Sequence, residues 1–125
     1  WYGVPGTKNG CTMSVSADGK SMTAVGTPTE SVSFTLISGD HPMYLLPGSY
    51  KLSGAPARAD VTGGYTWGLV VKNSETKADC GWDFGNGAEF KLDEITPVKV
   101  YIYISSSKSP DGYVWTPRLT GKETV

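Results

Sequence analysis

Few side chains in this sequence are of types that could catalyse a reaction. His41 is the only histidine, and Ser38 and Asp40 precede it in the same turn-rich segment. Acyl transfer would pair a histidine base with a nucleophile or an orienting carboxylate of this kind. The segment lacks a Gly-x-Ser-x-Gly turn and an oxyanion-hole motif, which such a site also requires. We therefore expect no catalytic residues.

Paired carboxylates would offer a second kind of chemistry. Glycoside hydrolysis needs two carboxyl groups held roughly 5 to 10 Å apart across a cleft. The candidate pairs are Asp79 with Asp83 and Asp93 with Glu94. Adjacent residues of an extended chain point to opposite faces, so Asp93 and Glu94 suit a solvated turn better. We expect that the protein is not an enzyme.

Metal-ligating residues are scattered rather than clustered. Two distant cysteines and one histidine do not supply the four ligands of a zinc site. Calcium could use Asp60 or Asp111, but a turn role fits each of them better, so we expect no metal and no cofactor. Cys11 and Cys80 could form a disulfide only if the fold brings their strands together, and the composition favours free thiols.

Aromatic residues are the strongest candidates for binding. The chain has four tryptophans and seven tyrosines, and Tyr101 and Tyr103 alternate with an apolar row in Val98–Ile104. Flat rings on a surface can stack on sugars or anchor a protein partner, although cross-strand pairing alone would also explain these tyrosines. Trp82 and the adjacent Asp83 are further candidates. Because Trp82 is in phase with apolar neighbours, packing is favoured over binding for its ring.

The candidate residues lie on or beside short segments in which apolar and polar residues alternate. Period-two spacing of apolar residues between turn residues predicts half-buried strands. Asp18-Gly19 suits a two-residue hairpin turn, and Gly85-Asn86-Gly87 predicts a second hairpin. The predicted strands are Cys11–Ala17, Met22–Gly26, Val32–Leu36, Met43–Leu46, Ser49–Ser53, Thr66–Lys72, Ala78–Phe84, Ala88–Leu92, Val98–Ile104 and Tyr113–Leu119.

This pattern predicts an all-β fold, because no segment has a capped 3.6-residue apolar period. We expect a two-sheet antiparallel β-sandwich of the jelly-roll type, with an immunoglobulin-like sandwich as the second choice. The 125 residues fit one domain. Because the chain opens on Trp1 rather than methionine, we expect a fragment of a longer protein.

Charge and hydropathy exclude some partners. The formal net charge is -1, which gives no field that would attract nucleic acid or anionic lipid. No apolar run approaches the roughly 20 residues needed to span a bilayer, and no segment resembles a signal peptide. We expect neither a nucleic-acid nor a membrane partner.

Four pieces of the chain, in this order, resemble domains of tail-associated and minor structural proteins of bacteriophages and prophages. The residues that carry the resemblance are Asn9–Thr27, Leu46–Pro56, Asp83–Leu92 and Val98–Ser106, with Tyr113–Leu119 as a looser fifth piece. The chain departs from that pattern at Cys11, where a branched aliphatic residue is commoner.

The resemblance implies a non-enzymatic virion module of a tail, baseplate or fibre that displays a host-surface or glycan recognition face. It implies other virion proteins and a host cell-surface glycan as partners, with homo-oligomers among the assemblies it allows. The alternative is a carbohydrate-binding module of a secreted glycoside hydrolase or bacterial adhesin, which would be extracellular. We expect recognition by the aromatic residues or by the loop Asp60–Tyr65.

Overall fold

The computed structural model describes residues 6–56, 67–85, 87–105 and 111–122. Twelve β-strands run through these residues, and none of the residues described is helical. The strands are β1 (Gly6–Lys8), β2 (Cys11–Val15), β3 (Met22–Val25), β4 (Val32–Ile37), β5 (Met43–Leu45), β6 (Gly48–Ser53), β7 (Trp67–Asn73), β8 (Asp79–Asp83), β9 (Ala88–Leu92), β10 (Thr96–Ile104), β11 (Val114–Trp115) and β12 (Arg118–Lys122).

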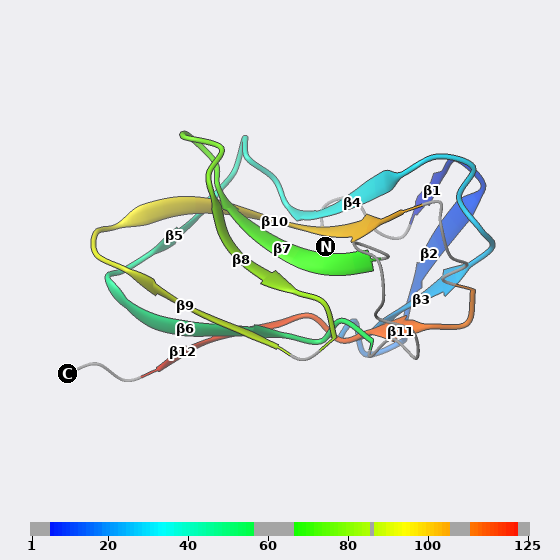
Figure 1. Ribbon diagram of the computed structural model, residues 1–125. Coiled ribbons are helices and arrows are strands. Elements are labelled where there is room, and N and C mark those ends of the chain that lie inside the picture. The colour runs from blue at the N-terminus through cyan, green and yellow to red at the C-terminus, as the bar shows by residue number, and fades with distance from the viewer. Residues whose placement is uncertain (1–5, 57–66, 86, 106–110, 123–125) are drawn as a thin grey trace.

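The strands form two layers (Figure 1). One layer is the sheet β4-β10-β7-β8, and β5 pairs with the first part of β10. The other layer consists of two smaller sheets, β12-β6-β9 and β1-β2-β3-β11. Every strand pair is antiparallel. The predicted all-β antiparallel sandwich is confirmed, with one layer divided into two sheets.

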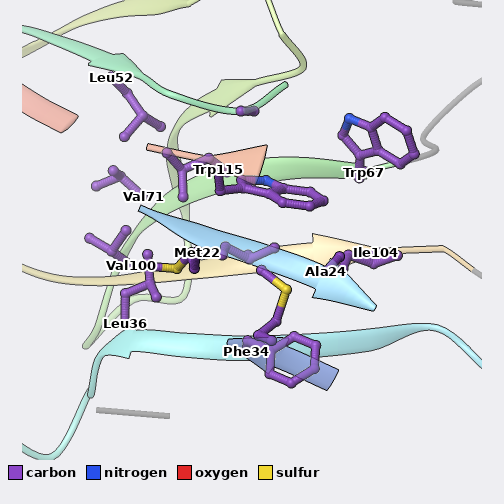
Figure 2. Packing of buried hydrophobic residues seen from close by; sticks show 14 of the residues in the cluster. Met22, Ala24, Phe34, Leu36, Leu52, Trp67, Val71, Val100, Ile104 and Trp115 are labelled. Atoms are coloured by element: carbon purple, nitrogen blue, oxygen red, sulfur yellow. The ribbon is translucent and has the colours of Figure 1, made fainter. Parts of the chain in front are cut away.

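The core lies between the two layers, and Figure 2 shows side chains from both layers meeting there. Every second residue is buried in β4, and in β10 from Val98 onward, as the alternation predicts. Each large apolar side chain that is fully buried contributes about 1.5–3 kcal/mol. The largest fully buried apolar side chains of this core are Trp115, Phe34, Met13, Met22, Leu52, Leu69, Ile102, Ile104, Val71 and Val98. Val70 is also fully buried but is not part of this core cluster.

The predicted hairpin at Asp18-Gly19 is confirmed, because β2 and β3 pair directly. The Ser16 hydroxyl and the backbone N–H of Lys20 both donate to the Asp18 carboxylate. These two hydrogen bonds lower the pKa of Asp18. Gly19 adopts a φ of +73°, which glycine reaches without the steric cost that a side chain adds.

Two local predictions are wrong. The Gly85-Asn86-Gly87 segment does not close a hairpin, because β8 pairs with β7 and β9 pairs with β6 in the opposite layer. The predicted last strand is divided into β11 and β12, which belong to different sheets. Pro117 lies at the division, where it interrupts pairing because proline has no backbone N–H.

The connection between β11 and β12 passes very close to the end of β6. The Thr116 N–H donates to the Gly54 carbonyl at 2.8 Å, and Gly54 has a φ of +114°. A Cβ at Gly54 would lie 1.9 Å from the Thr116 carbonyl oxygen, closer than any real contact. The end of β6 therefore requires glycine.

We expect Gly54→Ala to lower the free energy of unfolding by about 3 kcal/mol or more, because backbone strain and a backbone clash act together. Gly19→Ala is the matched control, since Gly19 also has a positive φ but no atom lies within 4 Å of its added Cβ. That control should cost only about 1 kcal/mol. Urea unfolding of both variants measures the difference, and equal losses would contradict this close approach as the cause.

Candidate functional site

The outer face of the sheet β4-β10-β7-β8 carries the predicted aromatic residues. On β10, Tyr101 and Tyr103 are half-buried and alternate with buried residues, which confirms that they lie opposite the core row. Tyr101 pairs with Val70 of β7, and Val70 in turn pairs with Trp82 of β8. The fold thus places three of the four predicted site residues on one face.

Trp82, Phe84 and Tyr103 gather at one end of this face. The rings of Trp82 and Phe84 are stacked with centroids 5.1 Å apart, and the Tyr103 ring meets Trp82 edge to face at 5.9 Å. Gly68 lies beneath them, since a Cβ there would come within 3.1 Å of Trp82 and 3.3 Å of Phe84. A bare backbone position in β7 therefore lets the two rings sit close to the sheet.

These rings line an open depression of about 460 Å³, which Asp79 completes on one side. We call the depression formed by Asp79, Trp82, Phe84 and Tyr103 the aromatic depression. The Tyr103 hydroxyl donates to the Ser31 hydroxyl at 3.3 Å, which fixes the ring's direction. The depression combines apolar ring surface with one carboxylate, the two features that a polar ring-shaped ligand can use together.

Charged groups lie in the next row of the same face. Lys72 and Asp79 form an ion pair at 3.3 Å, and the ammonium groups of Lys72 and Lys99 each lie 5.8 Å from the centre of the Tyr101 ring. Burial lowers the pKa of Lys72, but interactions with Asp79 and Tyr101 outweigh it and leave that pKa raised. Lys72 is therefore fully charged at neutral pH.

Asp83, the fourth predicted site residue, lies apart from the others. Its side chain is buried, with 1% exposure, and its carboxylate accepts backbone hydrogen bonds from Ala55, Gly85 and Gly87 at 3.0, 2.8 and 2.7 Å. Asp83 pairs with Leu69 on β7, whereas Trp82 pairs with Val70 and faces outward. The carboxylate fixes the connection by which the chain leaves one layer for the other.

A bulge explains why Trp82 faces outward. Gly81 pairs with Val71 and Asp79 with Lys72, so Cys80 is an extra residue in β8. Cys80 packs against the core cluster. The predicted common phase of Cys80 and Trp82 is therefore wrong, because an extra residue reverses the alternation.

Both cysteines are free thiols, as the composition favours. Cys11 lies in β2 and Cys80 in β8, which belong to different sheets. Burial raises the pKa of each thiol, with a smaller contribution from Asp111 at Cys11 and from Asp79 at Cys80. A protonated thiol is a poor nucleophile.

Where the structure describes them, the other polar candidates have structural roles, which are local at Ser38, Asp40 and His41 and long-range at Asp111. Near His41, the Asp40 N–H donates to the Ser38 hydroxyl and the His41 N–H to the Ser38 carbonyl. Asp111 accepts a hydrogen bond from Gly26 N–H at 2.8 Å.

Asp93 and Glu94 are exposed in the turn between β9 and β10. Asp60 and the loop Asp60–Tyr65 lie outside the described residues. Among the residues that are described, no three or more His, Cys, Asp or Glu side chains group as metal ligands.

Phe84 and Lys72 were not predicted as parts of this face, whereas alternation along Val98–Ile104 does predict that Lys99 lies on the same face as Tyr101 and Tyr103. Phe84 could have been recognised, because it stands two positions after Trp82. The pairing of Lys72 with Lys99 could not, because it depends on β7 and β10 lying side by side.

Comparisons of the chain with models of known families, with curated proteins and with solved structures found no match. Within the described part of the chain, no helix is long and apolar enough to cross a membrane.

We expect Asp83→Asn to lower the free energy of unfolding by about 1–3 kcal/mol, because a neutral amide cannot replace a buried carboxylate that accepts three N–H groups. Asp79→Asn, on the same strand but exposed, should change it by less than about 1 kcal/mol. Urea unfolding at pH 7 compares the two variants. Equal effects would contradict a structural role specific to Asp83.

Proposed function

We propose that this protein is a non-enzymatic recognition module that binds glycans at the aromatic depression. The observation that carries the proposal is the gathering of Trp82, Phe84 and Tyr103 with Asp79 on the outward face of a sheet whose inner face forms the core. Sugars present apolar ring faces and hydroxyl groups to a protein. Aromatic rings stack on the former, and a carboxylate accepts hydrogen bonds from the latter.

The arrangement of carboxylates supports binding rather than hydrolysis. Asp79 lies at the outer surface, whereas Asp83 is buried and already accepts three backbone hydrogen bonds. Glycoside hydrolysis needs two carboxyl groups on either side of the same bond. The two acids of β8 do not share a cleft.

We further propose that the module belongs to a virion, as part of a tail, baseplate or fibre, and contacts other virion proteins and a host cell-surface glycan. The resemblance of four ordered segments to phage structural domains supports this placement. The alternative is a carbohydrate-binding module of a secreted glycoside hydrolase or adhesin, which would use the same depression.

The genes around the parent gene distinguish these two placements. Capsid and tail genes on either side are the expected finding for a virion protein. A glycosidase domain in the same reading frame would instead contradict the virion placement and favour the alternative.

An array of bacterial cell-wall and capsular glycans tests the binding itself. We expect selective binding that becomes at least tenfold weaker in Trp82→Ala and in Tyr103→Ala, which corresponds to about 1.4 kcal/mol of lost contact. Tyr44→Ala is the matched control. Tyr44 is 64% exposed and pairs with Pro97 on the same sheet, about 20 Å along β10 from Tyr103.

Binding should survive the control substitution, and circular dichroism should show that all three variants are folded. Uniformly flat array signals would contradict glycan binding. An equal loss in Tyr44→Ala would contradict the depression as its site.

A further inference from the structure

Two lysines lie side by side on neighbouring strands of the outer face. Lys72 of β7 and Lys99 of β10 are register partners, and like charges in this position destabilise a sheet. Within the described part of the chain, Asp79 is the ion-pair partner of this lysine pair, at 3.3 Å from Lys72. This lysine pair therefore has two ammonium groups and one carboxylate partner. Repulsion between the two ammonium groups lowers the stability of the sheet at this position.

This lysine pair lies next to the aromatic depression. Tyr101 occupies the position between Lys99 and Tyr103 on β10, and both ammonium groups lie 5.8 Å from the Tyr101 ring. Side chains on one face of a strand recur about every 6.8 Å. Lys99 is therefore two repeats, about 14 Å, from Tyr103, whereas Lys72 lies 3.3 Å from Asp79, which lines the depression. A ligand whose first sugar occupies the depression thus reaches the lysine pair with its next sugar.

We infer that the glycan is anionic, with a carboxylate or phosphate group bound between Lys72 and Lys99. This inference rests on the proposed function and adds the chemical class of the ligand. An anion placed there attracts both ammonium groups and offsets their mutual repulsion, which a neutral sugar cannot do. Asp79 holds Lys72 in place through their ion pair. The space between the two ammonium groups, where the anion would bind, stays positively charged.

The aliphatic stems of lysines can also cover a ring without binding any ligand. Lys99→Met separates the two roles, because it keeps an apolar stem against Tyr101 and removes the charge. Lys99→Arg keeps the charge. Lys20→Met, in the exposed turn of the first hairpin, removes the same charge elsewhere and controls for the change in net charge.

Isothermal titration calorimetry at 50 mM NaCl compares four probes. They are an oligogalacturonate, its fully methyl-esterified form, a glucosylated glycerol-phosphate polymer and neutral maltohexaose. We expect at least one anionic probe to bind tenfold or more tightly than the neutral ones. The carboxylate and phosphate probes distinguish the two sources of the anion.

Lys99→Met should weaken binding of that anionic probe about fivefold, the equivalent of about 1 kcal/mol of Coulomb attraction. It should also raise the midpoint of thermal unfolding by about 1–5 °C, because the repulsion is removed. Lys99→Arg keeps the charge and should retain affinity to within about threefold, a smaller change than in Lys99→Met. Lys20→Met should bind as the unmodified protein does. Raising NaCl to 500 mM should weaken the anionic probe alone.

Equal affinity for the anionic and neutral probes would overturn this inference and leave glycan binding intact. So would an affinity for the anionic probe that is unchanged in Lys99→Met but lost in Trp82→Ala. Failure of every probe and every array glycan to bind would overturn the inference together with the proposed function.

Discussion

Strand β10 is the constraint on which the rest of the molecule depends. Its inward residues form the centre of the core, and β4, β5 and β7 all pair with it. A register shift of one residue would turn Val100, Ile102 and Ile104 to solvent, so burial fixes the strand in one position. The same burial fixes Tyr101 and Tyr103 on the outside. The location of the aromatic face is thus a consequence of the core.

Local information in the sequence was sufficient for most strands. Alternation and turn residues are properties of neighbouring positions, which is why β10 and the Asp18-Gly19 hairpin could be predicted. The path from β8 to β9 could not. It depends on the Asp83 carboxylate binding Ala55 N–H, 28 positions away in the chain, and a Gly-Asn-Gly turn fits a hairpin equally well when that contact is unknown.

The candidate site was predictable to a similar extent. Aromatic residues opposite an apolar row could be recognised, but the outward direction of Trp82 depends on a bulge at Cys80 that no local pattern indicates. The lysine pair depends on which strands become neighbours. Gly68 has a role only because the Trp82 and Phe84 rings approach it from the adjacent strand.

The outer face is also where the sequence departs from what stability alone favours. Glycine inside a strand costs about 0.5–1 kcal/mol relative to alanine, yet Gly68 lies in β7, between β10 and β8. The Lys72–Lys99 pair adds repulsion between those same strands. Sequences keep such locally unfavourable choices chiefly at functional sites. Both choices border the aromatic depression and neither is needed for the core, so they add support to the proposal that this face binds a ligand.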